Sequence, residues 1–149
     1  MANNDNSKGS GDLLTLPAKD NTIRHGDLVV QDGTTHNILP ATGANQDVVL
    51  VGVAQSSSLS PTGFDANGAA TTVTLTPISV ATRGVFDFTI SAAQYFIGDL
   101  VKIAGPQTVA KCSTNETAIG VVVANTAANA TTVRVKIGGA MTNQNMFIG

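Results

Sequence analysis

The feature that most constrains the fold of this chain is a repeated succession of three short segments. The first series comprises "GDLVV" at residues 26–30, "VVLVGVA" at 48–54 and "ATTVTL" at 70–75. The second series comprises "GDLVKI" at 98–103, "AIGVVVA" at 118–124 and "ATTVRV" at 130–135. Each segment alone is common in β-proteins, but three in one order indicate a duplication over about residues 26–76 and 98–137. Two small β-units can each cover the apolar face that the other could not bury alone.

The amino-acid composition agrees with a fold built from strands. The 149 residues include 19 threonines and 15 glycines but only one glutamate, Glu116. Threonine and valine favour pleated sheets and glycine favours turns, whereas the Glu–Lys pairs of exposed helices are nearly absent. With five Phe, one Tyr and no Trp, the core must consist mainly of Val, Ile, Leu and Ala. We therefore predict an all-β protein, a compact antiparallel β-barrel or β-sandwich of two related halves.

The chain divides into three parts. Residues 1–11 are polar and contain glycine, which predicts a flexible N-terminal arm, although many such ends have no role. Residues 12–139 are expected to form a single β-domain, large enough to bury its own core. Residues 140–149 form an apolar C-terminal tail. Within the domain, Ser, Gly, Asp, Asn and Pro together make up most of segment 56–68, which predicts a projecting loop.

The two "GDLV" segments predict structural turns. Gly26 and Gly98 permit the positive φ of a tight bend before a strand. Asp27 and Asp99 follow them and can accept hydrogen bonds from backbone amides of the same turn. We therefore expect each "GDLV" to mark the place where the chain enters a sheet.

The segment between the two series carries most of the aromatic side chains that we assign to the core. Phe86 and Phe88 fall on the same parity of an expected strand, so both should face the interior. Residues 91–96, "SAAQYF", are the only stretch for which we predict a helical turn.

Charge and targeting signals exclude several classes of protein. The eight Lys and Arg residues are scattered and the formal net charge is −2, which argues against binding to nucleic-acid phosphates. Cys112 is the only cysteine, so no internal disulfide is possible. The N-terminal segment lacks the apolar stretch of a signal peptide, and no apolar run reaches the length of a membrane span. We expect a soluble protein made in the cytoplasm.

No pattern of residues supports catalysis, a metal site or a cofactor site. His25, His36 and Cys112 stand at no spacing known for metal ligands, and Cys112 has no recognisable histidine partner. The aspartates lie mostly beside Gly or Asn, where a role in turns is the better interpretation. "DANG" at 65–68 resembles part of a calcium loop but lacks the remaining oxygen ligands. We predict that the protein is not an enzyme and has no cofactor.

Two apolar segments near the chain ends are candidate docking sites for a neighbouring molecule. The first is the group Leu13, Leu14 and Leu16, in which Leu14 and Leu16 alternate around Thr15 as in a strand with one buried face. The second is the group Met146, Phe147 and Ile148, which could dock on a neighbour or fold back on its own core. The sequence leaves both alternatives open for the second group.

The ordered segments of this chain resemble those of the small capsid cement, or decoration, proteins of tailed bacteriophages. The segments that carry the resemblance are "GDLVVQDG" at 26–33, "VGVA" at 51–54, "ATRGVFDF" at 81–88, "IGDLVKIA" at 97–104, "AIGVVVA" at 118–124 and "ATTVRVKIGG" at 130–139. The resemblance implies a β-tulip-like, non-enzymatic structural protein of the virion, made in the host cytoplasm. It implies a homotrimer that binds the outer capsid surface and bridges major capsid protein subunits. From the scattered charges and the lack of a long apolar run, we expect no nucleic-acid or membrane partner.

A second class of protein is compatible with the same strands. A β-sandwich adhesion or glycan-binding module of a phage fibre would have a similar composition. Such modules usually display aromatic platforms for sugars, and here Tyr95 and five phenylalanines are the whole supply.

Overall fold

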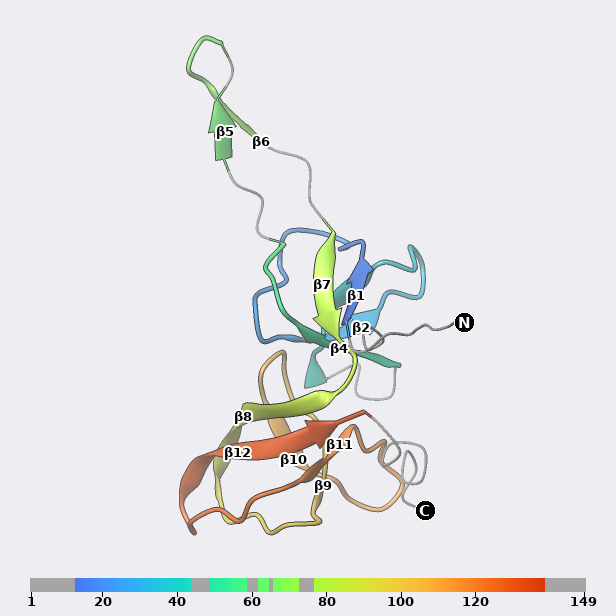
Figure 1. The fold of residues 1–149 in the computed structure, drawn as a ribbon, viewed down its shortest axis with the longest axis vertical. Coiled ribbons are helices and arrows are strands. Elements are labelled where there is room, and N and C mark those ends of the chain that lie inside the picture. Colours follow the sequence, from blue (N-terminus) through green and yellow to red (C-terminus); the bar gives the residue numbers. More distant parts are fainter. Residues whose placement is uncertain (1–12, 44–48, 59–61, 65, 73–76, 139–149) are drawn as a thin grey trace, which may run out of the picture.

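The structure, a computed structural model, describes residues 13–43, 49–58, 62–64, 66–72 and 77–138, and the backbone alone of 62–64 and 70–72. Over these ranges it contains twelve strands and no α-helix, which confirms the all-β prediction. Figure 1 shows two groups of strands stacked along the long axis of the molecule, with one hairpin projecting from the first group.

The two groups are antiparallel five-stranded sheets. The first has the order β1–β7–β4–β2–β3. Its strands are β1 (Leu13–Leu16), β2 (Leu28–Gln31), β3 (Ile38–Pro40), β4 (Leu50–Ala54) and β7 (Ile78–Ala81). The second, read from its long strand, has the order β8–β12–β11–β9–β10. Its strands are β8 (Gly84–Ala93), β9 (Leu100–Ile103), β10 (Val109–Lys111), β11 (Gly120–Val122) and β12 (Ala130–Ile137). In chain order the two sheets therefore have the same connectivity.

Each sheet is linked across its open side by one parallel bridge. In the first sheet, Ala18, just after β1, bridges to Ile38 in β3. In the second, Thr89 in β8 bridges to Thr108, just before β10. These bridges link the two ends of each sheet order at one point, so the sheets curl toward barrels.

The cores explain why two halves are needed. A first cluster lies within the first half and consists of Ala18, Ile23, Val29, Ile38, Ala54, Ile78 and Val80. A second, larger cluster fills the second half, with Phe88, Tyr95 and Val135 among its members. Successive side chains of a strand point to opposite faces. Consequently Val29 joins the first cluster, whereas Leu28 and Val30 of the same strand join the second. The halves therefore share an apolar interface.

The two "GDLV" turns have the same geometry. Gly26 and Gly98 have φ values of +94° and +98°. The Asp27 carboxylate accepts a hydrogen bond from the amide of Arg24 at 2.8 Å. The Asp99 carboxylate accepts the corresponding bond from the amide of Phe96 at 2.9 Å. A side-chain acceptor and a positive φ thus hold each bend before its strand.

The first half contains an extra hairpin. Strand β5 (Thr62–Phe64) pairs with β6 (Ala70–Thr72) in a two-stranded sheet of their own. The segment expected to be a projecting loop therefore contains a strand, and Figure 1 shows the hairpin projecting away from both sheets. Since β6 lies in this hairpin, β7 occupies the place in the first sheet that β12 occupies in the second.

The strand β8 corrects one prediction and confirms another. The helical turn expected at 91–96 is wrong, because β8 continues to Ala93, which pairs with Ala130 of β12. Pairing with a neighbouring strand here overrides the local preference of a short segment. Phe88 is buried and Phe86 packs half-buried against the same core, with ring centroids 6.4 Å apart, as predicted.

Candidate functional site

The first group of candidate docking residues lies on an edge strand. Among the described strands of the first sheet, β1 pairs with β7 alone. Leu13 and Leu14 are 55% and 44% exposed, whereas Leu16 is half-buried against the first core cluster. The expected buried face is therefore limited to Leu16. An edge strand with exposed leucines is a surface that another chain can cover by pairing or by apolar contact.

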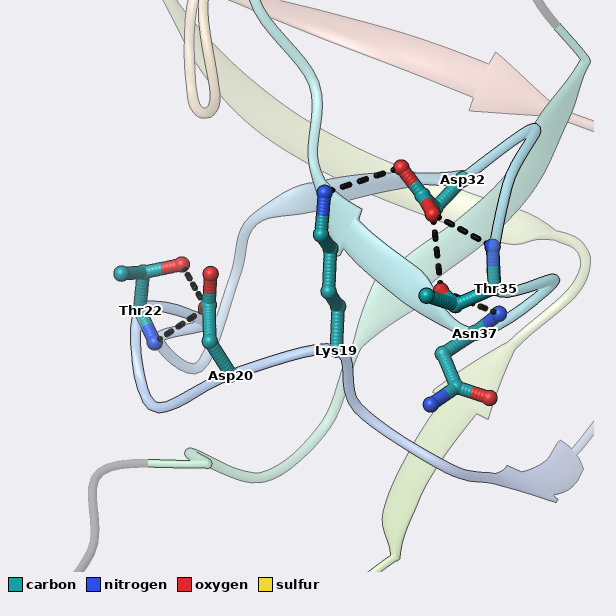
Figure 2. A network of polar contacts seen from close by, with 6 residues as sticks. All are labelled: Lys19, Asp20, Thr22, Asp32, Thr35 and Asn37. Carbon is teal, nitrogen blue, oxygen red and sulfur yellow. Dashed lines mark hydrogen bonds and ion pairs between the residues drawn. The ribbon is translucent and has the colours of Figure 1, made fainter.

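A polar network fixes the chain just after this edge strand (Figure 2). Lys19 Nζ lies 3.0 Å from an Asp32 carboxylate oxygen. The other oxygen accepts hydrogen bonds from the amide and the hydroxyl of Thr35, both at 2.7 Å. The hydrogen bonds from Thr35, and to a smaller extent the Lys19 ammonium, hold the pKa of the Asp32 carboxyl well below its usual range. The network ties the end of the β1 segment to the β2–β3 turn.

A neighbouring turn is closed in the same region. The Asp20 carboxylate accepts hydrogen bonds from the amide of Thr22, at 2.9 Å, and from its hydroxyl. The turn between Lys19 and Ile23 is thereby held locally, and Ile23 is fully buried. Together the two networks hold the chain in place just after β1.

The second group of candidate docking residues, Met146, Phe147 and Ile148, lies outside the described residues. The N-terminal arm, residues 1–11, lies outside them too. Docking by these segments stays a prediction.

A further exposed apolar pair, Phe96 and Ile97, was not singled out from the sequence. It lies in the connection between β8 and β9, with 50% and 65% of the two residues exposed. The signal that could have found it is the comparison of "RHGDLV" at 24–29 with "FIGDLV" at 96–101. The same "GDLV" turn thus follows polar residues in the first half and apolar residues in the second.

The surface also carries an open hollow of about 270 Å³ between β12 and the β11–β12 connection. Its lining includes Asp87 and Arg134, whose side chains form an ion pair at 2.9 Å, and Asn125 and Thr126. The hydrogen bond from Arg134 lowers the pKa of the Asp87 carboxyl. The two charged side chains of the lining are therefore exposed and paired with each other.

The phage cement protein family matches residues 8–137. The chain belongs to the phage cement protein family. Among curated proteins, the comparison found no relative of this chain. Membership in the family makes this protein a structural, capsid-associated component of the virion.

The remaining chemistry-bearing residues of this cement protein occupy ordinary positions. His25 and His36 are exposed, and burial raises the pKa of the Cys112 thiol. Over the described ranges, no three His, Cys, Asp or Glu side chains gather in one place. No helix in the described part of the chain has the length and apolar character to cross a membrane.

Proposed function

We propose that this protein binds the outer surface of the capsid and stabilises the contacts between major capsid protein subunits. The family gives the capsid association. The observation that carries the finer proposal is β1, an edge strand with Leu13 and Leu14 exposed and with its following turn held by Lys19 and Asp32. A rigid apolar edge suits a contact with a second protein better than it suits contact with water.

Avidity makes small contacts sufficient for this role. Full burial of a leucine side chain stabilises a complex by roughly 1.5–3 kcal/mol, and half-exposed leucines supply less. A clamp that holds several capsid subunits at once multiplies such weak contacts. We propose a homotrimer, whose threefold symmetry can match that of a capsid site. Native mass spectrometry and a capsid reconstruction test this, and single copies spread over the shell would contradict it.

The experiment for the edge strand is co-sedimentation with expanded capsids of the encoding phage, prepared without this protein. The double variant Leu13→Ser, Leu14→Ser should bind with lower occupancy and keep its thermal stability. Val85→Thr, which changes an exposed apolar side chain on β8, is the matched control and should bind as the wild type does. If the double variant and the wild type occupy capsids equally, β1 is not part of the contact with the capsid.

We also propose that the C-terminal group Met146, Phe147 and Ile148 docks on a neighbouring subunit or on the capsid. Strand β12, the last described strand of the second sheet, ends at Ile137, before the tail begins. Truncation after Asn145 should then reduce trimer formation or capsid occupancy, with little change in the melting of an isolated subunit. A loss of thermal stability at every protein concentration would show that the tail covers its own core instead.

The N-terminal arm is a third proposed contact. Removal of residues 2–11 should leave the fold intact, because a polar glycine-containing segment buries little apolar surface. The same deletion should weaken capsid binding. Unchanged capsid affinity would mean that the arm has no docking role.

The glycan-binding alternative has less support. Tyr95 and Phe88 are buried, and Phe96 is the aromatic residue most exposed among those whose side chains are described. Among the described side chains, this single largely exposed ring is a poor platform for a sugar chain. A glycan array combined with capsid co-sedimentation separates the two functions, since only an adhesion module would bind glycans and leave capsids free.

A further inference from the structure

The connection between β8 and β9 is a rigid turn with an apolar tip. Four consecutive amides are hydrogen-bonded: Tyr95 to Thr126 Oγ1 at 2.8 Å, Phe96 to Asp99 Oδ2 at 2.9 Å, Ile97 to Asn125 Oδ1 at 2.8 Å and Gly98 to the Val122 carbonyl at 3.0 Å. Beneath the tip, Tyr95 is buried and Lys111 Nζ lies 5.0 Å from the centre of its ring. The backbone of the tip is therefore fixed from both sides.

The first half builds the same turn from different side chains. Its four amides are bonded in the same way: Ile23 to Ser58 Oγ at 2.9 Å, Arg24 to Asp27 Oδ2 at 2.8 Å, His25 to Ser57 Oγ at 3.1 Å and Gly26 to the Ala54 carbonyl at 2.8 Å. Ser57 and Ser58 thus replace Asn125 and Thr126 as acceptors. The two turns are two copies of one scaffold.

The tips of the two turns carry side chains of opposite character. Arg24 and His25 occupy the first tip, and both are exposed. Phe96 and Ile97 occupy the second, where about half or more of each residue faces solvent. Because the scaffold is the same and holds the tip through backbone amides, folding does not require apolar side chains there. Exposed Phe and Ile reduce solubility, so their presence points to a partner that covers them.

We propose that Phe96 and Ile97 form an anchor that inserts into an apolar pocket of the major capsid protein. The inference rests on the proposed capsid-binding function. A stable contact between two copies of this chain needs about 800 Å² on each side, far more than two side chains on a turn can supply. A small apolar anchor is suited instead to one contact point of a clamp that touches a large lattice at several points.

The position of the turn agrees with a clamp. In Figure 1 the β8–β9 connection lies at the end of the second half, away from β1, which belongs to the first half. One molecule therefore presents two separated apolar contacts, Leu13 and Leu14 on one half and Phe96 and Ile97 on the other. The rigid turn adds affinity because little conformational freedom is lost when it binds.

The test transfers the first tip onto the second turn. The variant Phe96→Arg, Ile97→His carries side chains that the same scaffold already accommodates, so it should fold with an unchanged melting temperature. The matched control, Arg24→Ala, His25→Ala, alters the other tip. Binding to expanded capsids that lack this protein is measured for both variants and for the wild type, together with the oligomeric mass of each in solution.

We expect the tip variant to bind capsids about tenfold more weakly or worse, with its oligomeric mass unchanged, because removal of a buried aromatic anchor commonly has at least that effect. The control variant should bind as the wild type does. Provided that the wild type binds capsids, two results would overturn the anchor. One is binding of the tip variant equal to that of the wild type, and the other is a change in the oligomeric mass of the variant. If the wild type itself fails to bind, the proposed function is wrong and the anchor falls with it.

Discussion

Asp27 shows at the scale of one residue how the halves are joined. It is buried, and its second carboxylate oxygen accepts a hydrogen bond from Gln107 Nε2 at 2.9 Å, across the boundary between the sheets. The equivalent Asp99 has Lys111 Nζ at 3.7 Å instead. Asp27 therefore links the two halves, whereas the equivalent Asp99 forms an ion pair within the second half.

Replacement of Gln107 by alanine should lower the free energy of unfolding by about 1–3 kcal/mol, because a buried carboxylate oxygen loses its partner. Urea unfolding measures the change. Gln94→Ala, which alters an exposed glutamine in the β8–β9 connection, is the control and should have little effect. If both variants unfold alike, the bond to Asp27 does not stabilise the junction.

The lowered pKa of the Asp32 carboxyl predicts that the stability of the folded protein depends on pH. The Asp32 pKa is lowered in the folded protein, so the stabilisation is present above the unfolded value of about 3.9 and is lost as the pH falls toward the folded pKa. Asp32→Asn should therefore reduce the drop in melting temperature between about pH 6 and about pH 3. Lys19→Ala should do so less, since the Thr35 hydrogen bonds lower the pKa more than Lys19 does. If Lys19→Ala reduces the drop in melting temperature more than Asp32→Asn does, the ion pair with Lys19 contributes more than the Thr35 hydrogen bonds.

At the scale of elements, the repeated Gly-Val pairs have a packing reason. Gly52 in β4 and Gly120 in β11 occupy equivalent central strands. A Cβ atom at Gly52 would collide with the carbonyl oxygen of Ala81 in β7. At Gly120 it would lie 2.6 Å from the carbonyl oxygen of Lys136 in β12. Both strands approach their neighbours too closely for any side chain.

Gly52→Ala and Gly120→Ala should each destabilise the protein by about 1–3 kcal/mol or more, because the added methyl group forces two strands apart. Gly33→Ala is the control, since nothing lies within 4 Å of a Cβ atom placed there. Chemical denaturation compares the three. Wild-type stability in either strand variant would mean that the sheet relaxes without cost.

At the scale of the whole molecule, the β5–β6 hairpin is an insertion into one half. Val80 pairs with Ala54, 26 residues earlier, whereas Val135 pairs with Val122, 13 residues earlier. The first half thus crosses the same gap with 13 more residues. The described strands of the hairpin form a sheet separate from the two five-stranded ones.

Deletion of residues 62–74 should therefore preserve both five-stranded sheets. We expect the melting temperature to change by less than about 4 °C, which corresponds to about 1 kcal/mol in a chain of this size. Circular dichroism and thermal melting measure the outcome, with capsid binding measured in parallel. Loss of cooperative unfolding would show that the hairpin is part of the folding unit.

The sequence by itself determined the β class, the two "GDLV" turns and the facing of Phe86 and Phe88, because these depend on composition, on glycine φ values and on the period of a strand. Pairing between distant segments decided the rest. It extended β8 through Ala93, where a helical turn was expected, and it gave β7 rather than β6 the place next to β4. It also placed alternate residues of β2 in two different cores, because the two faces of this strand lie against different halves. Phe96 and Ile97 lie outside both cores, since neither half covers their turn.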